Sequence, residues 1–129
     1  MTDPAFLDDK PYHAHIYATF EERPRAEALR ATFARETGIL FVGCITEGKA
    51  GPHPIPQFEI HFCKSSLDRV LPMIEASGLR ALVHPLTKDD LADHTRLAHW
   101  IADPIALDLT TLDPPGVNQG IARFGKSDF

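Results

Sequence analysis

The sequence predicts an α+β fold in which strands and helices follow the order β-α-β-β-α-β. Two kinds of segment carry this prediction: short stretches in which apolar and polar residues alternate, and longer stretches with apolar residues every three or four positions. The 129 residues suit one domain, 1–129, with a core at about 11–101 and a tail at 102–129.

The first half of the chain predicts a strand, a helix and a second strand. Residues 1–10 are expected to form a loose leader, and the alternation at 12–20 predicts a strand. Pro24 can open a helix because its missing N–H is not needed there, and Gly38 is expected to end that helix. Residues 39–46 are apolar on both faces and predict a well-covered strand.

The second half repeats the pattern after a loop. Residues 47–56 hold two glycines and three prolines, which is typical of a stiff loop. The sequence then predicts an alternating strand at 57–63, a helix from about 65 that Pro72 kinks or delays, and a strand at 79–84. A third helix is expected at 88–101 before an irregular tail.

This order of elements is that of the ferredoxin-like sandwich. We expect an antiparallel sheet in the strand order 4-1-3-2, with the two main helices on one face and a C-terminal helix and tail added. The apolar residues of the alternating strands should face the helices. The opposite face, expected to be open, then carries His13, His15, Tyr17, Glu59, His61, Arg80, Leu82 and His84.

Four of these histidines should converge, because the start of the first strand lies beside the ends of the third and fourth. Imidazoles on adjacent strands, about 4.8 Å apart, can reach one metal ion. Imidazole with a carboxylate such as Glu59 nearby suits non-haem iron or zinc better than magnesium or calcium. The alternative is a set of ordinary strand histidines, since His13-x-His15 and Glu59-x-His61 match no zinc-finger or H-E-x-x-H pattern.

Several other polar residues have a structural or a functional interpretation. His53 is either a turn residue of the stiff loop or a group that this loop presents to a ligand. His94 is expected to point inward, where it needs a polar partner, whereas His99 should be exposed. Arg80 could hold a substrate carboxylate or form a surface salt bridge, and Cys63 has the buried structural thiol as its default.

The composition excludes several classes of protein. A net charge of -5 argues against a nucleic-acid binder, and no apolar run approaches the roughly 20 residues of a membrane span. The acidic start of the chain is unlike a secretory signal, and two cysteines suit a reduced, cytoplasmic setting.

Three blocks of the sequence, YHAHIY at 12–17, GPHPIPQFEIHF at 51–62 and HPLTKDDLADHTRLAHWI at 84–101, resemble the DOPA 4,5-dioxygenase family. The resemblance spans roughly 11–110. It implies a ferredoxin-like fold, a homodimer, and cleavage of a DOPA-like catechol ring by O2 at a non-haem Fe(II), with zinc as a substitute metal.

The resemblance also implies roles for individual residues. His15, His61 and His84 are expected to bind the metal, with His13 as the closest substitute and Glu59 as a carboxylate that would complete a two-histidine triad. We expect His53 or His94, with His13 nearby, to transfer protons, and Tyr17, Glu59 and Arg80 to contact the substrate.

Two other functions remain open from the sequence. One is a metal-free ligand-binding or regulatory dimer, since ferredoxin-like folds host many unrelated functions. The other is a cofactor-free oxygenase or isomerase that uses a histidine as its base.

Overall fold

The computed structural model describes residues 9–126, so residues 1–8 of the expected leader lie outside the described part. Five strands form one sheet in the order β2-β3-β1-β4-β5, with every neighbouring pair antiparallel. The strands are β1 (Pro11–Tyr17), β2 (Ile39–Val42), β3 (Gln57–Cys63), β4 (Ala81–Pro85) and β5 (His99–Ile101).

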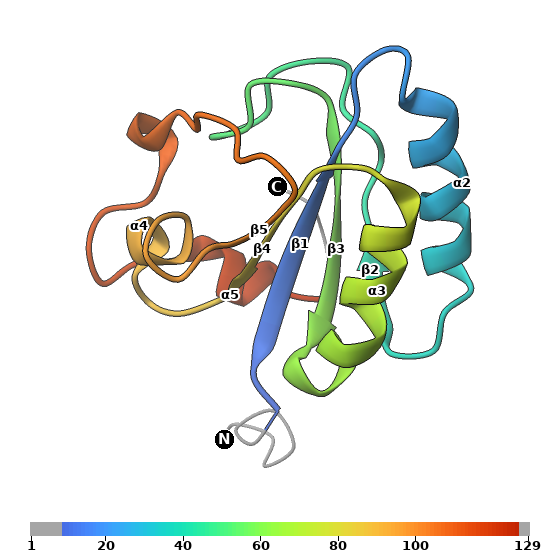
Figure 1. Ribbon diagram of the computed structural model, residues 1–129. Coiled ribbons are helices and arrows are strands. Elements are labelled where there is room, and N and C mark those ends of the chain that lie inside the picture. The colour runs from blue at the N-terminus through green and yellow to red at the C-terminus, as the bar shows by residue number, and fades with distance from the viewer. Residues whose placement is uncertain (1–8, 127–129) are drawn as a thin grey trace.

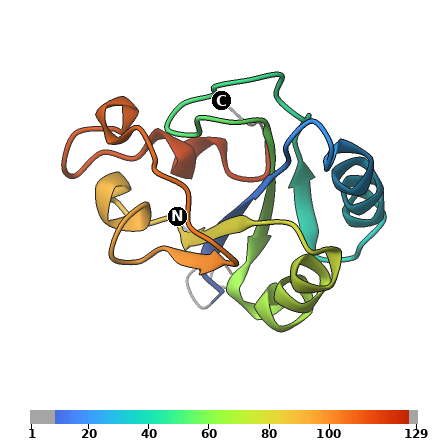
Figure 2. The ribbon, with the colours of Figure 1, turned by 45° about the horizontal axis from the view of Figure 1, so that its top comes forward.

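Two layers cover this sheet. Helices α2 (Arg23–Ala34) and α3 (Leu67–Ser77) lie on one side, and the chain after β4, apart from strand β5, lies on the other (Figure 1). That second layer contains α4 (Asp90–Asp93), the 3₁₀ turn η2 (Leu109–Thr111) and α5 (Gln119–Arg123), while a further 3₁₀ turn, η1 (Lys64–Ser66), precedes α3. Figure 2 shows the same separation from a second angle.

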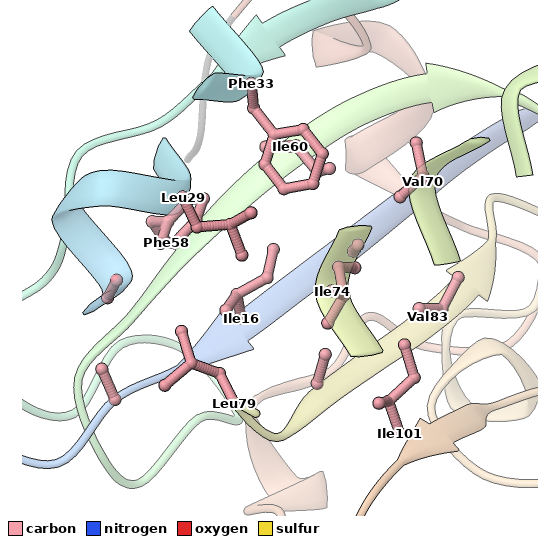
Figure 3. Packing of buried hydrophobic residues seen from close by; sticks show 14 of the residues in the cluster. Ile16, Leu29, Phe33, Phe58, Ile60, Val70, Ile74, Leu79, Val83 and Ile101 are labelled. Carbon is pink, nitrogen blue, oxygen red and sulfur yellow. The ribbon is translucent and has the colours of Figure 1, made fainter. Parts of the chain in front are cut away.

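The apolar core lies between the sheet and the two main helices, as the alternation predicted. Ile16, Phe58 and Ile60 project from β1 and β3 toward Phe33 of α2 and Ile74 of α3 (Figure 3). All five side chains are fully buried. The helix-facing sets predicted for the first, third and fourth strands are therefore confirmed.

The predicted strand order 4-1-3-2 does not match the observed order in full, because a fifth strand, β5, pairs with β4 at the edge of the sheet. The helix expected at 88–101 is wrong: α4 ends at Asp93, and β5 pairs with the edge of β4. Edge pairing satisfies backbone groups that β4 would otherwise leave open, and it places Ile101 against the core. These tertiary contacts override the helical spacing of the apolar residues.

Smaller differences concern element ends. β2 stops at Val42, and Leu40 is 50% exposed because β2 is a sheet edge, so the covered strand expected at 39–46 is wrong. Helix α3 begins before Pro72 and contains it, so the proline does not delay the helix. Gly78 ends α3 in the left-handed conformation. None of the helices in residues 9–126 is long and apolar enough to cross a membrane.

Candidate active site

The strand register brings the predicted histidines together. His13 of β1 lies opposite His61 of β3 on one side and His84 of β4 on the other, and His15 lies opposite Glu59. The rings of His13 and His61 stack with centroids 4.0 Å apart, and those of His13 and His84 are 5.5 Å apart. The convergence predicted from the strand order is confirmed.

The face that carries these histidines is not open, which corrects the expectation from the sequence. His13, His15, His61 and His84 are all buried. They lie beneath the C-terminal tail, which runs across this side of the sheet as the orange and red ribbon (Figure 2). The proline-rich tail therefore builds part of the site.

Side-chain hydrogen bonds hold the tail in place. The backbone N–H of Asp113 donates to Asp90 Oδ2 over 2.9 Å. The amide of Asn118 donates to the carbonyl of Thr87 at 2.6 Å and to Asp93 Oδ2 at 3.0 Å. Because Asp90 and Asp93 belong to α4, this short helix connects the tail to the strand layer.

Beneath the tail lies a cavity of about 130 Å³. For comparison, an engineered cavity of about 150 Å³ holds benzene. The cavity therefore has roughly the size of one aromatic ring. On the side formed by the strands, the proline-rich loop and α4, the cavity is lined by His13, His15, His53, Glu59, His84, Asp90 and His94.

One pair of imidazole nitrogens joins β1 to β4 at a short distance. His15 Nε2 and His84 Nε2 lie 3.0 Å apart. The Nδ1–H of His84 donates to the carbonyl of Pro85 at 2.8 Å, which leaves a lone pair on Nε2. His15 Nδ1 faces two acceptors, Gln57 Oε1 at 3.1 Å and Glu59 Oε1 at 3.5 Å, which favours the proton on that nitrogen.

In these neutral tautomers the two Nε2 lone pairs face each other across 3.0 Å. This arrangement is unfavourable for two bare imidazoles and suitable for a cation between them. Ligand nitrogens about 2.1 Å from one ion at a right angle are about 3.0 Å apart. A backbone carbonyl on the remote nitrogen, as His84 has, is also the usual support of a metal-binding histidine.

Three groups of side chains could hold a metal ion, each with ligand atoms within 4.8 Å of one another: His13, His15 and His84; His15, His53 and His94; and His13, Glu59 and His61. His13 Nε2 is buried and makes no hydrogen bond in the structure of residues 9–126. The first group combines this nitrogen with the facing pair of His15 and His84.

His61 has a different environment from the other strand histidines. Its Nδ1 accepts a hydrogen bond from the backbone N–H of Gly125 at 2.8 Å, so its proton is on Nε2. That Nε2–H donates to Glu59 Oε2 at 2.6 Å. Among the described residues, His61 does not line the cavity. This geometry suits His61 to hold the Glu59 carboxylate in place.

Burial keeps most of these imidazoles neutral. It lowers the pKa of His13, His15 and His84 well below the usual value, and the neighbouring histidines lower each pKa further. Burial also lowers the pKa of His53 to about 3. Neutral imidazole is the form that binds metals.

His94 and His53 lie beside the facing pair. Burial acts to lower the pKa of His94, but hydrogen bonds to Asp90 outweigh it and raise the pKa. The Nδ1–H of His94 donates to the carbonyl of Asp90 at 2.8 Å, which confirms the expected polar partner and leaves Nε2 as an acceptor. His53 Nδ1 hydrogen-bonds the hydroxyl of Tyr17 at 2.7 Å. The stiff loop thus does present His53 to the cavity.

The remaining predicted residues differ in position. His99 is exposed, as expected. Tyr17 reaches the site through His53, and its ring stacks on Trp100 of β5 with centroids 6.1 Å apart. Arg80 precedes β4, and among the described residues it is not part of the cavity lining.

Sequence reasoning missed the contribution of the tail. Thr111, Leu112, Asp113, Asn118, Gly120 and Arg123 all line the cavity. The tail has little periodicity, and its clearest local signal is Asn118, whose side chain caps α5 by accepting from the N–H of Gly120. That signal locates a short helix but does not tell which surface the helix covers.

The fold and the site define the class: an α+β protein with a buried, histidine-lined cavity that could hold a metal ion. The chain belongs to the Dopa 4,5-dioxygenase family, whose model matches residues 12–111.

Relatives agree with this membership. A DOPA 4,5-dioxygenase from Amanita muscaria is 30% identical over 115 residues, which cover 80% of this chain and 50% of that protein. An uncharacterized 21.2 kDa protein from Botryotinia fuckeliana is 30% identical over 112 residues, covering 77% of this chain and 61% of the relative. The chain thus spans half to three fifths of the length of these curated relatives.

A solved structure is also similar. The crystal structure of a candidate dioxygenase from Nostoc punctiforme superposes with a TM-score of 0.75 and 26% sequence identity. The match covers 86% of this chain and 96% of that one. This chain and that protein therefore share the fold over most of the length of each.

Proposed function

We propose that this protein cleaves the ring of a catechol with O2 at a non-haem Fe(II) held by His13, His15 and His84. The observation that carries the proposal is the pair of facing lone pairs on His15 Nε2 and His84 Nε2, 3.0 Å apart in a cavity the size of one aromatic ring. Family membership supports the reaction class.

The choice of His13 rests on the hydrogen bonds of His61. The sequence favoured His61 as the third ligand, with His13 as its closest substitute. Both nitrogens of His61 are engaged, by Gly125 and by Glu59, whereas His13 Nε2 is buried without such a bond. Three neutral imidazoles with a carboxylate nearby are a donor set that suits Fe(II) and also accepts zinc.

When bound, Fe(II) supplies a Lewis acid for the catechol oxygens and a redox centre for O2. The protein provides the remaining parts of the chemistry. His94, fixed by its bond to Asp90, offers Nε2 as the acceptor for a catechol proton, and His53, fixed by Tyr17, lies beside it. The tail excludes bulk water from the cavity. Both oxygen atoms of O2 end in the ring-opened product.

The experiment is anaerobic loading of tag-free protein with Fe(II), followed by O2 and a panel of catechols. We expect O2 uptake together with a yellow ring-cleavage product whose mass exceeds that of the catechol by one O2. Protein treated with a chelator, or loaded with zinc, is the control and should not turn over.

Two outcomes would overturn the proposal. Turnover that persists after chelation would establish a cofactor-free oxygenase with a histidine base. Tight catechol binding with neither metal uptake nor turnover would establish a ligand-binding module. Homodimer formation, which rests on the resemblance, is checked separately by light scattering after gel filtration.

A further inference from the structure

Tyr17 lies behind the cavity and contacts it through one histidine. Its hydroxyl is 2.7 Å from His53 Nδ1, and both side chains are fully buried. Among the described residues, His53 lines the cavity and Tyr17 does not. The tyrosine therefore acts on a ligand of the cavity by way of the imidazole.

Both residues are held in place by contacts outside the cavity. Ala50 and His53 exchange two backbone hydrogen bonds, of 3.0 and 2.9 Å, which close a tight turn in the proline-rich loop. The N–H of Tyr17 donates to the carbonyl of Arg80 at 2.9 Å, and its ring stacks on Trp100. The contact between Tyr17 and His53 therefore joins two fixed groups.

The proton of this contact belongs to the phenol. His53 is neutral, because burial lowers its pKa to about 3, so one of its ring nitrogens carries a proton and the other a lone pair. If the proton were on Nδ1, the buried hydroxyl of Tyr17 would need another acceptor, and within residues 9–126 it has none. Donation from the hydroxyl to Nδ1 satisfies both groups and puts the imidazole proton on Nε2.

The resulting Nε2–H is a donor at the cavity. His53 Nε2 is buried and makes no hydrogen bond to the rest of the described chain. The centroid of the His53 ring lies 4.1 Å from that of His15 and 6.3 Å from that of His94. A buried N–H costs free energy unless a partner accepts its hydrogen bond, so this geometry suits an acceptor among the histidines.

We propose that Tyr17 is a positioning residue that fixes His53 as a hydrogen-bond donor to the ligand of the cavity and keeps it from binding the metal. An Nε2 that carries a proton has no lone pair for an ion. Of the three groups that could hold a metal ion, the one that includes His53 then lacks a ligand. The tautomer does not depend on the reaction, whereas the acceptor, an anionic catechol oxygen, rests on the proposed function.

Nitrogen NMR of isotope-labelled, metal-free protein tests the tautomer, because protonated and unprotonated imidazole nitrogens have widely separated chemical shifts. His53→Gln identifies the signals of His53 by their loss. We expect the unmodified protein to show one form of His53, with the proton on Nε2 and a lone pair on Nδ1. Tyr17→Phe keeps the ring and removes the hydroxyl, so both tautomers should appear.

A second pair of measurements tests what the donor does. Anaerobic calorimetry of unsubstituted catechol with zinc-loaded protein measures binding without turnover, and Tyr17→Phe should weaken it by about 2- to 10-fold, as for one neutral hydrogen bond. Zinc affinity is measured by competition with a chelator. It should change by less than about 10-fold in His53→Gln, whereas the loss of a ligand predicts more than about 100-fold.

Tyr12→Phe is the matched control. Tyr12 is the other tyrosine of the chain and also belongs to β1, but it packs against the apolar core, where its ring stacks on Phe62. This variant should leave the His53 signals and catechol binding unchanged. Circular dichroism confirms that each variant is folded. If Tyr17→Phe is not, the spectrum of the unmodified protein and the zinc affinity of His53→Gln decide the proposal.

The outcomes separate this inference from the proposed function. A proton on Nδ1 in the unmodified protein, or an unchanged spectrum in Tyr17→Phe, would overturn the role of Tyr17 even when ring cleavage occurs. Loss of zinc affinity in His53→Gln by more than about 100-fold would make His53 a ligand, and equal catechol binding with and without the hydroxyl would remove the donor. If the tautomer depends on Tyr17 but no catechol is cleaved, Tyr17 is established as a positioning residue and the proposed reaction fails.

Discussion

Strands β1, β3 and β4 present one face to α2 and α3 and the other to the C-terminal tail (Figure 1). Both faces are buried, but they are closed in different ways. Toward the helices, side chains such as Ile16, Ile60 and Val83 exclude water with hydrocarbon alone. Toward the tail, imidazoles and the Glu59 carboxylate occupy the same strands and need polar partners.

The two faces of the sheet also differ in how they contribute to stability. Burying an apolar side chain contributes about 1.5 to 3 kcal/mol, whereas a buried polar group without a hydrogen bond costs about 1 to 3 kcal/mol. His13 Nε2 and His53 Nε2 are such groups within residues 9–126. Natural proteins tolerate this conflict where a site needs it, so the tail-side face is shaped by function and the helix-side face by folding.

The largest expected effect separates two histidines of the tail-side face. His13→Gln should weaken Fe(II) binding by more than about 100-fold, because it removes a ligand, whereas His61→Gln should weaken it by about 10- to 100-fold or less, as for a residue that supports a ligand set. Metal affinity is measured by competition with a chelator. His99→Gln, at an exposed histidine, is the control. The reverse order for His13 and His61 would return His61 to the ligand set.

On the helix-side face, loss of hydrocarbon should affect folding and leave the metal site intact. Ile60→Ala removes a fully buried side chain from β3 and should lower the free energy of unfolding by about 2 to 5 kcal/mol. Leu40→Ala, at a half-exposed position on β2, should change it by about 0.5 kcal/mol. Urea unfolding gives both values, and metal content at saturation should be unchanged. Loss of metal in folded Ile60→Ala protein would show that the two faces are coupled.

The alternation of β1 and β3 carried most of what the sequence could predict. A period of two assigns each residue to a face, so the core residues and the histidines separated correctly, and the strand order then brought the histidines together. The hydrogen bonds of His61 could not be predicted in this way, because they depend on the N–H of Gly125, 64 residues further along the chain.

The structure of the segment after β4 could not be predicted from the periodicity of its apolar residues. Leu91, Thr95 and Ala98 have helical spacing, yet Leu91 and Thr95 are exposed. The buried residues there are Ala92, Asp93 and His94, of which the last two are held by Thr87 and Asp90. The tail has no periodic pattern that would indicate which surface it covers. Its contribution to the cavity depends on individual hydrogen bonds that have no signal in local sequence, such as those from Asn118 to Thr87 and Asp93.

The smallest expected effect concerns protons on the tail-side face. His53 has a pKa of about 3 when folded and about 6.5 when unfolded, so the unfolded chain binds more protons between these values. Stability from this group is therefore complete above about pH 6.5 and falls as the pH decreases toward 3, by up to about 1.4 kcal/mol per pH unit. The lowered pKa values of His13, His15 and His84 act in the same direction.

Metal-free protein shows this effect directly, because a bound ion would compete with the protons. The free energy of unfolding should fall between pH 6.5 and 4.5, and His53→Gln should reduce that slope by up to about 1.4 kcal/mol per pH unit, since glutamine can still bond Tyr17 without binding a proton. His99→Gln should leave the slope unchanged, and so should Ile60→Ala, which lies on the other face. If His53→Gln and His99→Gln have equal slopes, His53 is protonated as easily folded as unfolded. The tail would then not exclude water from the cavity, and the contrast between the two faces of the sheet would be lost at this residue.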